Sequence, residues 1–322
     1  MAVFLDERCV AGLLTMEDAL AAVEEVFREQ GRGGAVNVPR VRAPLKGGVL
    51  RITAGVLLYR GLYGVKVSST AVFGRGAGRM FSLYREESGE LCAIVQVFGL
   101  GALRTGAASG VATKFLANAD ARVLGVLGSG RQAKTQVEAV CRVRRIAEVK
   151  VFSPTPAHRD GFCREIGRAH GVKAVPVESP EAAVRESDVV VSATTSSEPV
   201  VRGAWLAAGA HVNAVGANYE HRRELDTAAV AAASFIAADD PEQARYEATD
   251  LVEPVREGAL AWERVHRLAD VVAGNLTGRA SATDITLYKS LGVAIEDVAL
   301  AARACEKALA QKAGVELPDL AG

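Results

Sequence analysis

The sequence predicts an α/β protein that combines a doubly wound parallel sheet with an antiparallel β domain. Two observations support this prediction. Between Val38 and Val97, short β-like runs are separated by glycine-rich or charged turns such as Gly74–Gly78, which is typical of an antiparallel sheet. After residue 117, short apolar runs alternate with helical segments, which is typical of a parallel sheet covered by helices. A chain of 322 residues is long for one hydrophobic core, so two domains are expected.

The expected elements follow in order. Thr15 and Asp18 form a capping pattern, apolar residues then recur at helical spacing, and Gly31 ends this first helix. Pro176 interrupts the third run of the parallel sheet, so we expect that strand at an edge, where a lost backbone hydrogen bond is tolerated. A long helix beyond Val293 is expected to return to the first domain, which gives domains at residues 1–117 with 293–322 and at 118–292. The runs predicted to form the parallel sheet are "RVLGVLG", "EVKVFS", "VKAVPV", "DVVVSAT", "AHVNAVG" and "SFIAAD".

The composition excludes several classes of function. The 38 basic and 38 acidic residues balance, so neither a nucleic-acid partner nor an anionic membrane is expected. Five scattered cysteines without a C-x-x-C pair indicate a reducing compartment, and neither they nor the five histidines are spaced like metal ligands. No signal peptide or membrane anchor is expected, because the first residues mix acids with bases and eighteen apolar residues never run together. We therefore expect a cytoplasmic protein without a metal site.

The segment "VLGVLGSGRQAKTQ" contains a glycine loop that is typical of dinucleotide sites. Gly128, Ser129, Gly130 and Ala133 follow the first parallel strand and open a helix. The first glycine permits a tight turn, the second admits a pyrophosphate close to the backbone amides, and the small Ala133 lets helix and strand pack. The motif alone is equally compatible with a glycine-rich turn that binds nothing. The alternating strands and helices around it favour a Rossmann-type domain that binds a dinucleotide.

The end of the second parallel strand bears on which dinucleotide is bound. An acidic residue there would bind the ribose 2′-hydroxyl of NAD, but Ser153 stands 25 residues after Gly128. Thr155, His158 and Arg159 follow, and together with Ser153 they would suit a 2′-phosphate. The alternative is that all four are ordinary solvated loop residues. We expect NADP(H) to be favoured, with NAD(H) possible.

Four segments in this order resemble the ornithine cyclodeaminase/mu-crystallin family, and together they extend over most of the chain. This resemblance implies hydride exchange between a nicotinamide and the α-carbon of an amino or imino acid. It also implies a homodimer in which the antiparallel domains join, each subunit keeping its own nucleotide domain. The segments are "RTGAASGVATKFLA" (residues 104–117), "GSGRQA" (128–133), "NAVGANYEHRRELD" (213–226) and "YKSLGVAIED" (288–297).

The resemblance implies that Arg40, Lys66 and Arg104 bind the substrate carboxylate. Guanidinium groups suit this task because they grip a carboxylate through two hydrogen bonds. Lys66 alternates within an apolar β run, where a buried ammonium needs a partner or a function. Arg104 and Thr105 are expected at the start of a helix, where free amides and the helix dipole also favour an anion. For any one of these cations, a solvated surface charge is the plain alternative.

The resemblance also implies a set of cofactor contacts beyond the glycine loop. Arg222 stands where the cyclodeaminases have a lysine that faces the cofactor, and Val215 and Gly216 are expected under the nicotinamide. For Thr194 and Ser290, a hydroxyl that merely caps a strand end or a helix is the alternative. The implied contacts are Gln132, Ala133, Thr194, Val215, Gly216, Arg222, Ser290 and Leu291.

The sequence departs from the cyclodeaminases at two positions. Asn218 replaces an Asp near the reacting nitrogen, and Arg51 stands where the cyclodeaminases have a Glu. An amide forms hydrogen bonds but does not titrate near pH 7, so repeated proton transfer at one site becomes difficult. Reduction of a preformed cyclic ketimine requires only a protonated C=N bond, a bound carboxylate and a hydride. Arg51 faces either the pocket, where it would suit a second carboxylate, or solvent.

We therefore expect a reductase of 1-pyrroline-2-carboxylate or 1-piperideine-2-carboxylate. In this interpretation Arg40 and Arg104 clamp the carboxylate, and Asn218 orients the nitrogen. Lys66 donates a proton or holds the carboxylate. The alternatives are an ornithine cyclodeaminase, an alanine-type amino-acid dehydrogenase and a non-catalytic, crystallin-like binding protein.

Overall fold

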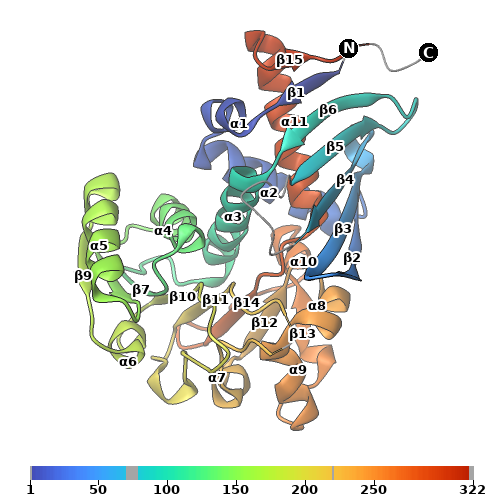
Figure 1. Cartoon of the computed structure of the whole chain (residues 1–322). Helices are drawn as coiled ribbons and strands as arrows, with labels where there is room; N and C mark the ends of the chain where they lie inside the picture. The colour runs from blue at the N-terminus through green and yellow to red at the C-terminus, as the bar shows by residue number, and fades with distance from the viewer. Residues whose placement is uncertain (1, 70–78, 220, 319–322) are drawn as a thin grey trace. The chain divides into compact units, whose positions relative to one another are not determined.

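The computed structural model describes residues 2–69, 79–219 and 221–318, which form two compact units (Figure 1). The first unit contains residues 1–104 and 292–322, and the second contains residues 105–291. Helix α3 (Phe98–Leu116) runs across the change from the first unit to the second. The predicted turn at Gly74–Gly78 lies outside the described residues. Among the described residues, no helix is both long enough and apolar enough to cross a membrane.

The first unit is built on a seven-stranded sheet in the order β15-β1-β6-β5-β4-β3-β2. The strands β2 to β6 pair antiparallel, which confirms the predicted antiparallel domain. Two short strands near the ends of the chain extend the sheet: β1 joins β6 in parallel, and β15 joins β1 antiparallel. They were not predicted, because runs of two or three residues are too short to show alternation. The strands are β1 (Val3–Leu5), β2 (Ala35–Leu45), β3 (Gly48–Leu57), β4 (Leu62–Ser69), β5 (Met80–Arg85), β6 (Leu91–Gln96) and β15 (Val315–Glu316).

Besides the beginning of α3, the described residues of the first unit form the helices α1 (Glu7–Leu13), α2 (Met16–Gly31) and α11 (Ala294–Gln311). The predicted capping pattern at α2 is confirmed, because the Asp18 amide donates to Thr15 Oγ1 and the Asp18 carboxylate accepts from the Thr15 amide. Helix α11 packs on α2 and crosses strands β2 to β6 (Figure 1). Gly55 on β3 allows this close approach, since a Cβ there would lie 2.9 Å from the Ile295 nitrogen. The beginning of α11 is thereby held against the sheet.

The second unit is built on eight parallel strands in the order β13-β12-β14-β11-β10-β7-β8-β9. All six predicted strands are present, and Pro176 lies on the edge strand β9 as expected. The order changes direction between β7 and β10, the point where doubly wound sheets open a ligand crevice at the carboxyl ends of their strands. The strands are β7 (Val123–Leu127), β8 (Glu148–Phe152), β9 (Lys173–Pro176), β10 (Val189–Ser192), β11 (His211–Ala214), β12 (Phe235–Ala238), β13 (Val265–Arg267) and β14 (Thr286–Lys289).

The strands β13 and β14 were not predicted. All four residues of β14 are buried between β11 and β12, yet Thr286 and Lys289 are polar, which hides the strand from a search for apolar runs. The helices of the second unit are α4 (Arg131–Val143), α5 (Pro156–His170), α6 (Pro180–Val184), α7 (Thr227–Ala232), α8 (Pro241–Glu247), α9 (Thr249–Arg256) and α10 (Leu268–Val272). Apolar side chains of the sheet and these helices form two buried clusters.

Candidate active site

Lys66 lies on the face of the first sheet that α11 covers. It pairs with Thr53 on β3 and with Phe81 on β5, and the latter is fully buried. The Lys66 side chain is 13% exposed, and its ammonium forms an ion pair with the Asp297 carboxylate on α11. The sequence pattern predicted a buried lysine in need of a partner, and Asp297 is that partner.

Arg104 is buried and bonds to the same segment of α11. Its Nη1 lies 3.0 Å from Glu296 Oε2, and its Nε lies 3.2 Å from Asp297 Oδ1. The prediction that Arg104 starts a helix is wrong, because α3 begins at Phe98 and Arg104 lies within it. The free amides at the true start of α3 are bound by Glu7, which accepts from Phe98 and Gly99. Arg104 therefore receives no help from a helix N-terminus in binding an anion.

Arg40 bonds to Gly292, two residues before α11 begins. Its Nη2 donates to the Gly292 carbonyl at 2.7 Å. Gly292 has φ +73°, and a Cβ there would lie 2.3 Å from Arg104 Nη1. Only glycine therefore fits at this position beside the Arg104 guanidinium. Arg40, Lys66 and Arg104 thus come from three separate elements and meet around residues 292–297.

Burial and charge set the protonation of this cluster. Burial lowers the pKa of Lys66 to about 8, with repulsion from Arg104 and Arg40 acting in the same direction and Asp297 opposing them. Burial alone would raise the pKa of Asp297, but Lys66 and Arg104 hold it below its ordinary value. At neutral pH the ammonium is therefore mostly charged and close to its own pKa. Such a group can both attract a carboxylate and release a proton.

Glu296 and Asp297 end the segment 288–297 that resembles the family, but no function was predicted for them. Both side chains are fully buried, although they stand in the first turn of a helix whose other buried residues are mainly apolar. Two adjacent acids inside an apolar segment were a usable signal, since buried carboxylates need cationic partners. They form ion pairs with Lys66 and Arg104.

The strand register shows where Arg51 lies. Arg51 pairs with Ser68 on β4 and with Arg42 on β2. Thr53 and Lys66, the neighbouring pair, stand two residues along the same strands, and side chains two residues apart share a face. Arg51 is therefore half-buried on the Lys66 face of the sheet rather than on the opposite one.

The glycine loop of the second unit has the geometry that a pyrophosphate requires. Gly128 has φ +106°, and a Cβ there would lie 2.5 Å from the Ala193 carbonyl oxygen. Around Gly130 a Cβ would meet nothing within 4 Å, so space is open in front of α4. Among the described residues no side chain caps α4, so its first amides, including those of Gln132 and Ala133, are directed at this space. The loop fits the phosphates of a dinucleotide.

The end of β8 presents hydroxyl groups and no carboxylate. Ser153 is buried and hydrogen-bonds to Ser129 of the glycine loop, with 2.9 Å between the two Oγ atoms. Thr155 and His158 are exposed at the start of α5. Arg159 is buried instead, and its guanidinium donates to the Val177 carbonyl and to Glu178 Oε1 at 2.8 and 2.7 Å.

The remaining cofactor candidates cluster near the carboxyl ends of the parallel strands. Thr194 follows β10, Val215 and Gly216 follow β11, and Ser290 and Leu291 follow β14. Ser290 Oγ is fully buried and has no hydrogen-bond partner among the described residues.

Three further candidates contact neighbouring residues of the second unit. Asn218 Nδ2 donates to the Val215 carbonyl at 3.2 Å, and the Arg222 guanidinium lies over the Tyr219 ring. Buried Thr105 of α3 accepts from Gln136 Nε2 of α4 through its carbonyl, at 3.1 Å.

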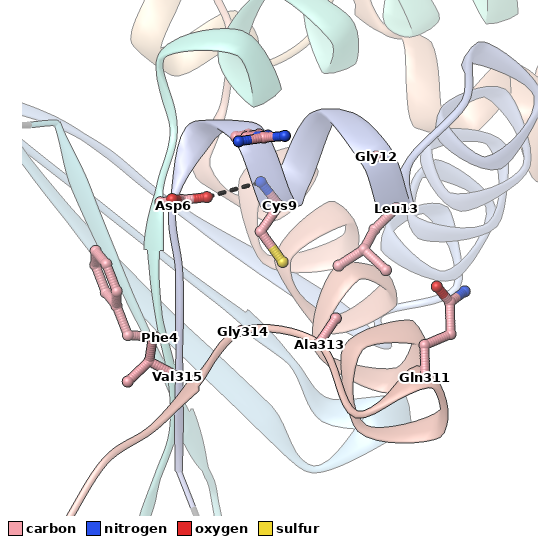
Figure 2. A pocket seen from close by; sticks show the side chains of 10 residues that line it. Phe4, Asp6, Cys9, Gly12, Leu13, Gln311, Ala313, Gly314 and Val315 are labelled. Carbon is pink, nitrogen blue, oxygen red and sulfur yellow. Dashed lines mark hydrogen bonds between the residues drawn. The ribbon is translucent and has the colours of Figure 1, made fainter.

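A separate hollow in the first unit involves none of the predicted residues. It encloses about 460 Å³ between α1 and the segment that follows α11 (Figure 2). Figure 2 shows Asp6 bonded to the Cys9 amide, where it caps α1, and the other labelled side chains are mostly apolar. No group of His, Cys, Asp or Glu side chains among the described residues has the arrangement of a metal site.

Comparisons with known proteins agree on one family. The sequence model of the ornithine cyclodeaminase/mu-crystallin family matches residues 2–312. The Δ1-pyrroline-2-carboxylate reductase of Thermococcus litoralis, solved with NADH and L-proline, is similar with 33% identity and a TM-score of 0.93 over 98% of this chain and 100% of that one. An archaeal alanine dehydrogenase dimer with bound NAD gives 33% and 0.93 over 99% of both chains. The iminosuccinate reductase of Paracoccus denitrificans with NAD⁺ gives 29% and 0.92 over 98% and 99%.

Proposed function

Because the chain belongs to the ornithine cyclodeaminase/mu-crystallin family, we propose that it reduces the C=N bond of an α-imino acid, with a cyclic ketimine of the 1-pyrroline-2-carboxylate or 1-piperideine-2-carboxylate type as substrate. The chain is an NAD(P)-dependent oxidoreductase of this family. The observation that carries the proposal is the cluster of Arg40, Lys66 and Arg104 around residues 292–297, where three cations from separate elements suit the carboxylate that every α-imino acid carries.

Each side chain of the cluster has a task in this reaction. Arg40 and Arg104 bind and orient the substrate carboxylate. Lys66, with a pKa of about 8, holds a proton for the imine nitrogen, so that the C=N carbon becomes electrophilic. The bound nicotinamide dinucleotide supplies the hydride, and one hydride with one proton converts the imine to the amine. Asp297 keeps Lys66 charged until the proton is needed.

Asn218 argues for reduction rather than cyclodeamination. Cyclodeamination must oxidise an amine, close a ring, expel ammonia and reduce the new imine, so one site must move protons several times. The Asn218 amide donates to the Val215 carbonyl and has no carboxylate to titrate. Asn218 would orient the substrate nitrogen without exchanging a proton with it.

A panel of substrates tests the proposal. The purified protein is assayed with both preformed ketimines, with ornithine and with pyruvate plus ammonia, each with NADH and NADPH. Reduction of a ketimine with no proline formed from ornithine supports it. Conversion of ornithine to proline would favour a cyclodeaminase. Ammonia-dependent oxidation of the dinucleotide with pyruvate would favour an alanine-type dehydrogenase, and binding without turnover a crystallin-like role.

The position of Arg51 favours a second candidate substrate, an α-imino acid with a second carboxylate. Arg51 and Arg42 stand opposite each other on the Lys66 face, two residues along the strands from the Thr53–Lys66 pair. Two guanidinium groups on this face suit a second carboxylate. Oxaloacetate with ammonia, which forms iminosuccinate, belongs in the panel, and Arg51→Met should depress its reduction more than that of the monocarboxylates.

The cofactor proposal is a preference for NADP(H). It rests on Ser153, which puts a hydroxyl where a carboxylate would repel a 2′-phosphate, and on the exposed Thr155 and His158 nearby. Arg159 would have to leave Glu178, a partner whose side chain is 87% exposed, to reach a phosphate. An equal or higher kcat/KM with NADH than with NADPH would exclude this preference.

The partner that we propose is a second copy of the chain. Four apolar residues form one continuous cross-strand row on the sheet face opposite Lys66, and each is between 36% and 57% exposed: Val41, Ile52, Val67 and Met80. Such a row is unusual on the surface of a monomer. A Val67→Asp variant should therefore be monomeric by light scattering, while Leu309→Asp, at an exposed apolar position on α11, should not change the assembly.

Two further proposals follow from the sequence. We assign substrate binding and dimerisation to residues 1–117 and 293–322, and dinucleotide binding to residues 118–292. The five cysteines are free thiols, which fits the cytoplasmic location that we propose.

A further inference from the structure

Glu224 joins the backbone that follows two neighbouring parallel strands. It lies within the segment 213–226 that resembles the family, but no function was predicted for it. Its side chain is fully buried. Oε1 accepts hydrogen bonds from the amide and the hydroxyl of Thr194, both at 2.7 Å. Oε2 accepts one from the Gly216 amide at 2.6 Å. Thr194 follows β10 and Gly216 follows β11, so a single carboxylate links the carboxyl ends of both strands.

Asp250 and Lys289 fix Glu224 in turn. Asp250 Oδ1 accepts from the amides of Glu224 and Leu225 at 2.7 and 3.0 Å. Asp250 Oδ2 accepts from Lys289 Nζ at 2.9 Å, and both side chains are fully buried. All four carboxylate oxygens therefore have a donor, as buried charges require. The cluster ties the strand ends β10, β11 and β14 to helix α9.

We propose that Glu224 is a positioning residue for the dinucleotide, whose carboxylate sets the spacing of the Thr194 and Gly216 backbones where the nicotinamide half is bound. The inference rests on the proposed function, because it requires a dinucleotide at the carboxyl ends of these strands. The Thr194 hydroxyl already donates to Glu224 and accepts from the Ser196 amide at 3.1 Å. Thr194 accordingly serves the cofactor through its backbone and not through its hydroxyl.

The spacing that Glu224 sets is tight. A Cβ on Gly216 would lie 2.3 Å from the Thr194 carbonyl oxygen and 2.6 Å from Glu224 Oε1. In Glu224→Gln, one acceptor oxygen becomes an amino group that faces an N–H donor, so a strand end must move to escape it. The same change leaves one carboxylate, Asp250, with one ammonium, Lys289, so it does not introduce an unpaired charge.

Asp188 provides a matched control at the amino-terminal ends of the strands in the same sheet. Its Oδ2 accepts from the amides of Arg122 and Val123, both at 2.8 Å, at the amino end of β7. Asp188→Asn therefore disturbs a similar carboxylate clamp on the backbone, but at the edge where no dinucleotide is expected.

The experiment measures the Kd of NADH and NADPH by calorimetry on the full-length wild type, Glu224→Gln, Thr194→Val and Asp188→Asn, together with KM for the ketimine. We expect Glu224→Gln to weaken the Kd about tenfold or more, which is about 1.4 kcal/mol, because a strand end must move to separate the new amino group from the N–H donor that faces it. KM for the ketimine should stay within twofold. Thr194→Val, which removes one donor, should give a smaller loss, and Asp188→Asn none beyond twofold.

Two results would overturn the inference: equal weakening in Glu224→Gln and Asp188→Asn, or an unchanged Kd in Glu224→Gln. If Glu224→Gln does not fold, Thr194→Val against Asp188→Asn decides by the same comparison. A wild type that binds neither dinucleotide would instead refute the proposed function, so the two failures are distinguishable.

Discussion

Replacement of Asp297 by Asn should move the pH at which activity is lost. Lys66 keeps a pKa of about 8 because the negative charge of Asp297 opposes burial and the repulsion of Arg104 and Arg40. Removing one partner of a buried ion pair costs about 3–5 kcal/mol. Asp297 serves both Lys66 and Arg104, so about half of this cost falls on the ammonium, which at 1.36 kcal/mol per unit lowers its pKa by about 1–2 units. The pKa should then lie at about 6–7.

The assay is the pH profile of kcat/KM for the ketimine at saturating dinucleotide, between about pH 5.5 and 9.5. Because we propose that Lys66 donates the proton, the wild type should lose activity as the pH rises through about 8, and Asp297→Asn at a lower pH. Glu296→Gln is the matched control, because that neighbouring carboxylate bonds Arg104. Its inflection should stay within about half a unit of the wild type. An inflection that remains near 8 in Asp297→Asn, or a wild-type profile without one, would refute the role of Lys66.

Three further predictions concern the second unit. Gly130→Ala should cost no more than about 1 kcal/mol of stability but greatly weaken dinucleotide binding, because its Cβ enters the open space in front of α4. Gly128→Ala should lose both stability and dinucleotide binding, because Gly128 has φ +106° and a Cβ there would meet the Ala193 carbonyl. Equal unfolding curves for the two variants would contradict this. Ser153→Asp should raise the ratio of kcat/KM for NADH over NADPH, and a constant ratio would remove Ser153 from cofactor choice. Burial lowers the pKa of His211 to about 3, so the unfolded chain alone takes up this proton below pH 6.5. Urea unfolding should therefore show full stability above pH 6.5 and a loss of up to about 1.4 kcal/mol per unit below it, a slope that His211→Met should reduce.

The fold could be predicted largely from apolar periodicity, because the strands of both sheets bury mainly apolar side chains. The exceptions have physical causes. The strand β14 buries Thr286 and Lys289, so its pattern looks polar. Helix α3 was expected to begin at Arg104, but it begins at Phe98, where Glu7 binds its free amides. The glycines within α3 made a helix look less favourable, yet they allow close packing, since a Cβ on Gly106 would lie 2.5 Å from the Thr135 carbonyl oxygen.

The candidate site could be predicted only in part. Arg40, Lys66 and Arg104 were identified one by one from a resemblance. Their meeting around residues 292–297 depends on the register of β3 with β4 and on the close approach of α11 to Gly55, and a single sequence specifies neither. Glu296, Asp297 and Glu224 were missed because their function lies in their partners. A carboxylate that holds another residue in place has no spacing rule of its own.

The placement of Gly292, Glu296 and Asp297 bears on how the chain matures during synthesis. The cations that they hold are made early, but this acidic segment leaves the ribosome only after the whole of residues 105–291. Domains generally fold as units while the chain grows, so the second unit can be complete and able to bind a dinucleotide while Lys66 and Arg104 still lack their counter-ions. The proposed site for the imino acid is therefore finished last, and a chain released early would carry the proposed nucleotide site without the proposed place for its substrate.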